Sequence, residues 1–273
     1  MKCGKYELDF TDKTLIMGIL NITPDSFSDG GSFNELDRAV DRAKEMVEMG
    51  ADIIDIGGES TRPGHEVVPA EEEISRVVPI IEAISREVNV PISIDTYKAA
   101  TARKAIEAGA SIINDVWGAK KDPEMARVAA DTGAPIILMH NRDNREYNHF
   151  VRGAIQDLQE SIFIAKGAGV KDEQIILDPG IGFAKTVQLN IEMMRHLDVI
   201  VSLGYPVLLG TSRKSIIGHV LDLPVKERME GTGATVCYGI QKGCHIVRVH
   251  DVKEMARMAR MMDVLVGKEK RYG

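Results

Sequence analysis

The sequence predicts an α/β protein with a (β/α)8 TIM-barrel fold, and three observations lead to this prediction. Short apolar runs recur along the chain, amphipathic segments of helix length separate them, and polar residues stand where the runs end. The eight runs are TLIMGIL, ADIIDIGG, PISID, SIIND, PIILMH, QIILDPG, PVLLGTS and HIVRVHD. Functional residues of such barrels lie at the carboxyl ends of the strands. We therefore expect the functional site where these runs end.

The chain length agrees with one barrel. The chain has 273 residues, and a barrel domain takes about 250, so we expect residues 1–273 to form a single domain. No Ser/Gly-rich linker or charge block divides the sequence. The alternative, an open doubly wound sheet, would place a GxGxxG phosphate-binding motif after the first strand. The segment there is NITPDSFSDGG, which favours the closed barrel.

Each element follows from its local pattern. The alternating start KYELDF predicts a short N-terminal extension that closes the barrel floor. The strands are nearly continuous apolar runs, as expected when both faces of a parallel sheet are covered. Their expected centres lie near Met17, Asp55, Ile94, Ile113, Ile137, Ile176, Leu209 and Arg248. Several of the helical segments between them end in glycine, in EMGAD, EAGAS and DTGAP, where a left-handed residue ends the helix.

Charge and cysteine usage narrow the class of protein. The formal net charge is −7, which argues against nucleic acid or an anionic membrane as partner, since both prefer a basic surface. The start of the chain has no signal-peptide pattern, and no apolar stretch reaches the roughly 18 residues of a membrane span. Cys3, Cys237 and Cys244 have no metal-binding spacing. We expect a soluble, cytoplasmic protein with reduced thiols.

Two strand-to-helix loops are unusually long. The loops after the first and second strands read NITPDSFSDGGSFN and GGESTRPGHEVVPA. Most such connections take only a few residues. Both loops leave the barrel mouth from adjacent strands, and we expect them to close over a substrate there.

Strand alternation predicts which charged residues meet at the mouth. Residues two apart share a face, so Asp95, Asp178, Arg248 and His250 are expected to converge. Buried charges are costly unless paired or liganded, and a purely structural ion-pair network is the alternative. The remaining run-end histidine, His140, is expected to be structural.

The residue types suggest a heterocycle and a phosphate group as ligands. Asp95, Asn114 and Asp178 suit an amino-amidine edge, because carboxylates accept and amides both donate and accept hydrogen bonds. Arg248 and His250 suit a phosphate or diphosphate. Asn21 offers an oxygen to Mg²⁺, which takes few protein ligands. The segment GTSRKS opens a helix and predicts a further anion site; a Schiff base on its lysine is the alternative.

At its motifs the chain resembles the dihydropteroate synthase family. The matching segments, in the family's order between about residues 14 and 252, are GILNITPDSFSDGG, DIIDIGGESTRPG, ISIDTYK, IINDV, LMH, ILDPGIGF, LLGTSRKS and RVHDV. One segment departs: after the fifth strand this chain has NRDNREYNHF where many members have a Met-Gln-Gly-Thr-Pro type loop. The resemblance therefore implies no substrate contacts for this segment.

The resemblance implies an activity. It implies a transferase of folate biosynthesis that condenses (7,8-dihydropterin-6-yl)methyl diphosphate with 4-aminobenzoate, releasing diphosphate, and that is a sulfonamide target and a homodimer. Ionisation to a pterin methylene cation, followed by capture by the aromatic amine, is the expected mechanism. The rivals are a methyltetrahydrofolate-type methyltransferase, which would need a corrinoid partner, and a catalytically silent pterin-binding subunit.

The resemblance also implies site residues. Those for the pterin diphosphate are Thr61, Asp95, Asn114, Val116, Met139, Asp178, Phe183, Lys214, Arg248 and His250. Those for 4-aminobenzoate and the closing loops are Phe27, Ser28, Arg62, Pro63 and Ser215, and the Mg²⁺ ligand is Asn21. The implied catalytic residues are Asp29, Asp95, Lys214, Arg248 and His250.

Overall fold

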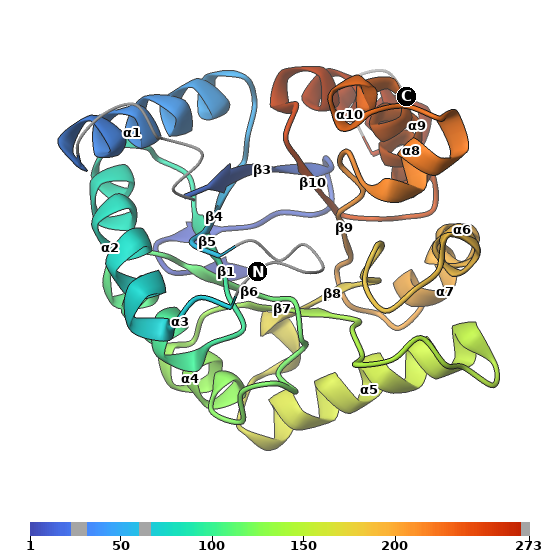
Figure 1. The fold of residues 1–273 in the computed structure, drawn as a ribbon, viewed down its shortest axis with the longest axis horizontal. Helices are drawn as coiled ribbons and strands as arrows, with labels where there is room; N and C mark the ends of the chain where they lie inside the picture. The colour runs from blue at the N-terminus through green and yellow to red at the C-terminus, as the bar shows by residue number, and fades with distance from the viewer. Residues whose placement is uncertain (23–31, 60–66, 269–273) are drawn as a thin grey trace.

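Eight parallel strands form a barrel, as the sequence predicts (Figure 1). The structure is a computed structural model and describes residues 1–22, 32–59 and 67–268. The strands are β3 (Leu15–Asn21), β4 (Ile53–Gly57), β5 (Ile92–Asp95), β6 (Ile112–Asp115), β7 (Ile136–Met139), β8 (Ile175–Asp178), β9 (Leu208–Leu209) and β10 (Ile246–Val249). All eight predicted centres fall inside them. The sheet order β8-β7-β6-β5-β4-β3-β10-β9 is closed by a bridge between Leu177 and Val207.

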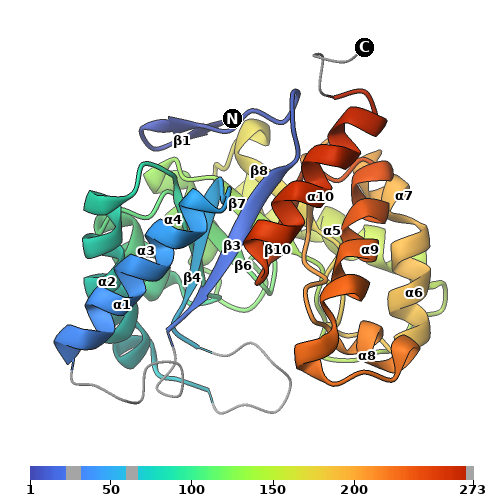
Figure 2. The same ribbon diagram turned by 90° about the horizontal axis from the view of Figure 1, so that it is seen from above.

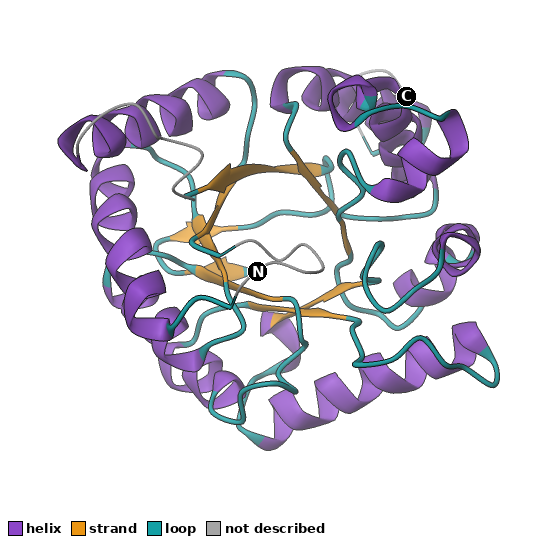
Figure 3. Cartoon of the chain, in the orientation of Figure 1, coloured by secondary structure: helices purple, strands orange, loops and turns teal. Residues whose placement is uncertain are grey.

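Helices surround the strands on the outside of the barrel (Figure 3). They are α1 (Ser32–Glu48), α2 (Ala70–Glu87), α3 (Ala99–Glu107), α4 (Met125–Thr132), α5 (Phe150–Gly167), α6 (Val187–Arg195), α7 (Leu197–Val201), α8 (Ser215–Leu221), α9 (Met229–Gln241) and α10 (Val252–Leu265). The predicted glycine stops are confirmed, because Gly50, Gly109 and Gly133 have φ of 106°, 119° and 71°. Among the described helices none is long and apolar enough to cross a bilayer.

The apolar residues form two layers separated by the sheet. Outward-facing strand residues, such as Ile54 and Ile94, pack against the helices in the larger cluster. Inward-facing residues fill the lower barrel, and this cluster consists of Cys3, Leu8, Leu15, Met17, Ile53, Ile112, Ile137, Ile176, Leu208 and Ile246. Because side chains alternate along a strand, the next inward position on each strand stands one layer closer to the mouth. The interior packing therefore aims those positions at the site.

A β-hairpin closes the barrel floor. The sequence predicts a single extended segment there, whereas the chain forms two strands, β1 (Lys2–Cys3) and β2 (Tyr6–Glu7). The difference arises at Gly4, whose φ of 58° turns the chain back on itself. Cys3 and Leu8 then enter the interior cluster. The hairpin lies at the end of the barrel where the strands begin (Figure 2).

Shortening Leu8, which lies in the interior cluster next to the floor hairpin, should destabilise the barrel. Leu8 is only 5% exposed, so Leu8→Ala should lower the free energy of unfolding by about 2–4 kcal/mol through lost burial and a new cavity. The control is Leu265→Ala, at a leucine that is 65% exposed, which should cost less than about 0.5 kcal/mol. Urea unfolding measures both. Equal midpoints for the two variants would show that the hairpin does not contribute to the core.

Candidate active site

A buried guanidinium joins two carboxylates at the top of the barrel interior. Arg248 on β10 donates from Nε to Asp55 Oδ2 at 2.6 Å and from Nη2 to Asp95 Oδ2 at 2.7 Å. Asn114 on β6 donates to Asp55 Oδ2 at 3.4 Å. These residues come from four strands, so only the closed barrel brings them together. Of the four charged residues expected to converge, Asp95 and Arg248 are in direct contact.

Asp55 is a site residue that our sequence reasoning missed. We treated it only as the centre of a strand, yet it is fully buried and bonded to both Arg248 and Asn114. The signal was present in ADIIDIGG, where the second aspartate interrupts a buried apolar run. A buried charge of this kind requires a partner. Which residue would supply that partner could not be read from local sequence.

β5 contributes polar atoms that the protein leaves without partners. Asp95 Oδ1 and the Ser93 hydroxyl are buried, and neither has a hydrogen-bond partner within the described part of the chain. Buried polar atoms are normally hydrogen-bonded, so these two can receive groups from a ligand. Burial raises the pKa of Asp95, Arg248 lowers it, and the nearby Asp55 raises it further. Additional donors from a ligand would therefore stabilise the Asp95 carboxylate.

A second carboxylate and a lysine stand on the other side of the barrel. Asp178, at the end of β8, accepts the backbone N–H of Gly180 at 2.7 Å through Oδ1. Burial raises its pKa, while Lys214 and the Gly180 N–H lower it. Lys214, just before α8, donates to the carbonyl of Ile181, and its Nζ lies 4.7 Å from the centre of the Phe183 ring. Burial lowers the pKa of Lys214 to about 8, against the effect of Asp178.

The apolar residues assigned to the slot occupy neighbouring strand ends. Met139 ends β7, Val116 directly follows β6, and both are buried. Phe183 follows β8 and is half-buried beside Lys214. β7 lies between β6 and β8 in the sheet, so Met139 stands between Asn114 and Asp178. A flat ring bound between Asp95 and Asp178 would contact these apolar side chains.

His250 is held by the segment that follows β9. Its Nδ1 lies 2.8 Å from the Ser212 hydroxyl, which also accepts the His250 backbone N–H at 3.1 Å. Arg213 anchors the same segment by two hydrogen bonds to Asp251. Ser215 begins α8 and is exposed. Lys214 and Ser215 therefore border the mouth on the side of β9 and β10.

The proposed metal ligand lies at the surface, and most of the two long loops lies outside the described residues. Asn21 is exposed at the end of β3, paired in register with Gly57. The described residues contain no group of three His, Cys, Asp or Glu side chains that could hold a metal. Six assigned residues lie outside the described part of the chain, and their roles stay predictions: Phe27, Ser28, Asp29, Thr61, Arg62 and Pro63.

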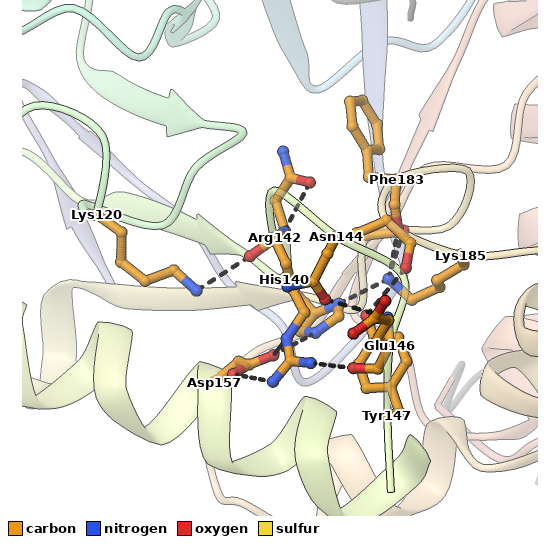
Figure 4. A network of polar contacts seen from close by, with 12 residues as sticks. Lys120, His140, Arg142, Asn144, Glu146, Tyr147, Asp157, Phe183 and Lys185 are labelled. Carbon is orange, nitrogen blue, oxygen red and sulfur yellow. Dashed lines mark hydrogen bonds and ion pairs between the residues drawn. The ribbon is translucent and has the colours of Figure 1, made fainter. Parts of the chain in front are cut away.

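His140 belongs to a polar network beside the site, which Figure 4 shows. Its Nε2 lies 2.9 Å from Asp157 Oδ2, and its Nδ1 lies 2.7 Å from Lys185 Nζ. Burial lowers the pKa of His140 to about 4. The sequence marks His140 as structural but contains no signal that separates Lys185 from the exposed lysines, because only the fold buries it.

Known proteins share these features along nearly the whole chain. The family model described as "Pterin binding enzyme" matches residues 17–250. The dihydropteroate synthase of Bacillus subtilis is 63% identical over 96% of this chain and 92% of its own length. That of Clostridium beijerinckii is 62% identical over 97% and 99%. This chain belongs to the dihydropteroate synthase family.

Solved dihydropteroate synthases have the same fold. The Clostridium difficile protein, in the presence of pteroic acid, superposes with a TM-score of 0.93 at 52% identity, covering 95% of this chain and 99% of the other. The Xanthomonas albilineans protein with 4-aminobenzoic acid has a TM-score of 0.89 at 39% identity, covering 93% and 94%. The Yersinia pestis protein in a sulfonamide complex reaches 0.91 at 38%, covering 98% and 99%. The expected family and barrel fold are thereby confirmed.

Removing Asp55 should weaken the fold as well as the site. Asp55→Ala leaves the Arg248 guanidinium buried with one carboxylate fewer, and breaking a buried pair costs about 3–5 kcal/mol. Glu107→Ala is the control, because Glu107 pairs with Lys104 on the surface, and such pairs contribute about 0–1 kcal/mol. Chemical denaturation compares the two. A loss below 1 kcal/mol for Asp55→Ala would contradict the structural role of this ion pair.

Proposed function

We propose that this member of the family joins (7,8-dihydropterin-6-yl)methyl diphosphate to 4-aminobenzoate, giving 7,8-dihydropteroate and diphosphate in folate biosynthesis. One observation carries the proposal: Asp95 and Asp178 stand at opposite sides of one barrel mouth, each beside a cation and each without a full set of donors. The pteroic acid and 4-aminobenzoic acid named with the related structures support the same two substrates.

The pterin ring would bind between the two carboxylates. Asp178 Oδ1 is occupied by Gly180, so its other oxygen is the one to accept from the amino-amidine edge. Asp95 Oδ1 and the Ser93 hydroxyl are partnerless within the described residues and suit the opposite edge. Asn114 adds an amide beside them, since its side chain makes only long hydrogen bonds among the described residues, to the two oxygens of Asp55 at 3.5 and 3.4 Å. Val116, Met139 and Phe183 would cover the faces of the ring.

The charge balance of the site favours a cation on the pterin. Asp55 and Asp95 share one guanidinium, that of Arg248, whereas Lys214, Arg248 and Lys185 act on Asp178. When the C–O bond to diphosphate breaks, its electron pair leaves with the oxygen, and positive charge remains on the pterin methylene and ring. Preorganised charges stabilise such a state without rearranging, and one group of this kind is typically worth about 3 kcal/mol. Asp95 is best placed among the described residues, with Asp29 expected to assist.

Capture by the amine completes the reaction. The nitrogen lone pair of 4-aminobenzoate forms the new C–N bond, and the nitrogen then loses a proton to water or to the departing diphosphate. The aromatic amine is uncharged near neutral pH, so no strong general base is needed. Lys214 and Ser215 would border its carboxylate, and the two long loops, with Phe27, Ser28, Arg62 and Pro63, would close over the site.

The diphosphate would lie toward β3 and β10. Arg248 has N–H groups beyond those given to Asp55 and Asp95, and His250 follows on the same strand, with Thr61 expected nearby. Asn21 fits Mg²⁺, because it is exposed at the end of β3 and offers an amide oxygen, and this ion takes most of its ligands from substrate and water. Bound Mg²⁺ would neutralise charge that builds up on the leaving diphosphate.

We also infer a homodimer in the cytoplasm. Apolar residues exposed on α8 and on the chain that follows it support the dimer, since Val220, Leu221 and Val225 are 61%, 47% and 43% exposed. A second copy of the chain would cover this surface, as apolar patches often mark contacts between subunits. Cys3, Cys237 and Cys244 are free thiols, which agrees with a reducing compartment.

The reaction itself is the first test. Protein mixed with Mg²⁺, dihydropterin diphosphate and 4-aminobenzoate should form dihydropteroate, detected by chromatography. Excess EDTA should reduce the rate at least tenfold, and Asn21→Ala should need a higher Mg²⁺ concentration for half its maximal rate. Product formed equally well in EDTA would contradict the metal assignment. No product at all, with pterin binding intact, would refute the proposed reaction.

Asp178 should dominate pterin affinity. Asp178→Asn removes a charged acceptor, and hydrogen bonds to charged groups contribute about 1.5–3 kcal/mol, or roughly 10- to 100-fold in affinity. The control is Asp172→Asn, because Asp172 is an exposed aspartate that pairs with Lys166 far from the mouth. Calorimetric titration with the pterin substrate should show weaker binding for the first variant only. Unchanged affinity for Asp178→Asn would mean that the pterin binds elsewhere.

A further inference from the structure

The segment between β8 and α6 carries three groups that face the proposed site. Phe183 lies under the Lys214 ammonium, the Ile181 carbonyl accepts from Lys214, and the Gly180 N–H donates to Asp178. Its backbone is unusual: Gly180, Gly182 and Ala184 have φ of 65°, 89° and 47°. A non-glycine residue in the left-handed region costs about 1–2 kcal/mol. Contacts outside the segment must therefore hold this conformation.

Those contacts come from Lys185, His140, Asp157 and Tyr147, which we call the support network (Figure 4). We propose that this network positions residues 180–184 for pterin binding, with Lys185 and Tyr147 as positioning residues that touch no substrate. The proposal rests on the proposed function and extends it to residues outside the mouth. It also assigns a role to the divergent segment after β7, which contains Tyr147.

Lys185 is the centre of the network. It is only 4% exposed, and its Nζ lies 2.8 Å from the Gly180 carbonyl, 3.0 Å from the Phe183 carbonyl and 2.7 Å from His140 Nδ1. Burial lowers the pKa of Lys185 to about 7, while Asp178 raises it; in the ammonium form each of its three donors has one acceptor here. Two of the three acceptors belong to the segment itself. Lys185 therefore ties the two ends of the turn around Gly180 and Phe183 to the barrel.

His140 and Asp157 fix the direction of these bonds. Burial raises the pKa of Asp157, but hydrogen bonds from His140 and Arg142 outweigh it and lower the pKa to about 2. His140 is neutral at pH 7, because burial lowers its pKa to about 4. Its Nε2–H must then donate to the carboxylate, which leaves Nδ1 as the acceptor for Lys185. The α5 residue Asp157 thus orients the imidazole that receives the lysine.

Tyr147 supports the segment from the other side. Its hydroxyl donates to the Ala184 carbonyl at 3.0 Å, next to Lys185. The Arg142 guanidinium lies 4.4 Å from the centre of its ring, and the Phe150 ring packs edge-on at 4.9 Å between centroids. Arg142 also bonds to Asp157 at 2.7 Å. Tyr147 and Lys185 therefore belong to one network, because both connect to Asp157 on α5, through Arg142 and His140 respectively.

The gentlest test removes one hydroxyl. Tyr147→Phe keeps the ring packing and deletes the bond to Ala184; one hydrogen bond is worth about fivefold in an equilibrium. We expect the KM for the pterin diphosphate to rise about fivefold, with the KM for 4-aminobenzoate unchanged. The control is Tyr205→Phe, which deletes a tyrosine hydroxyl bonded to Asp172 on the surface. It should change neither value.

A second measurement needs no catalysis. In the free protein the N–H groups of Gly180, Gly182 and Phe183 are bonded to Asp178, Asn190 and Gly180. Hydrogen exchange of the peptide spanning residues 180–186 should speed up several-fold in Tyr147→Phe. It should speed up further in Lys185→Met, with Lys242→Met, at a surface lysine paired with Asp198, as its control. Should Lys185→Met fail to fold, Tyr147→Phe alone decides.

The outcomes separate the two proposals. Unchanged exchange in the 180–186 peptide for Tyr147→Phe would overturn the support network, whatever the reaction. Equal rises in both KM values, together with a lower unfolding temperature, would mean general destabilisation and would also overturn it. Faster exchange with a selective rise in the pterin KM supports it. If the unaltered protein forms no dihydropteroate, the proposed function is refuted. The hydrogen-exchange data would still show whether the support network holds residues 180–184.

Discussion

The site depends on Arg248 held between Asp55 and Asp95 inside the barrel. Removing a guanidinium and two carboxylates from water costs several kcal/mol for each charge, and only good geometry offsets that cost. The geometry is available because β4, β5 and β10 place the three side chains in one interior layer above the apolar floor. Closure of the barrel, including the short contact between β8 and the chain before β9, is therefore a condition for the site.

The opposite side of the mouth is built by different means. Asp178 and Lys214 are set by loop backbone: the carboxylate accepts a loop N–H, and the ammonium donates to a loop carbonyl. This side relies on the support network around Lys185, whereas the Arg248 side relies on strands.

Most of the fold could be predicted from one sequence. Apolar runs such as PIILMH and QIILDPG have strand length, glycine stops end the helices, and the eight strand centres are all confirmed. The mouth residues Asp95, Asn114, Asp178 and Arg248 were found because strand ends are local features. The floor hairpin was not, because its first strand and its turn at Gly4 precede the alternating segment KYELDF, which indicates one strand only.

By itself, the sequence determined the barrel, the family and the polar strand ends, since each is encoded by periodicity or by contiguous motifs. Only the tertiary structure decided the partners: Asp55 for Arg248, 193 positions away in sequence, and Lys185 for His140, 45 positions away. Burial and distance between such residues arise from closure of the sheet and packing of α5 against it. A buried lysine and an exposed one read the same in the chain, and the fold alone distinguishes them.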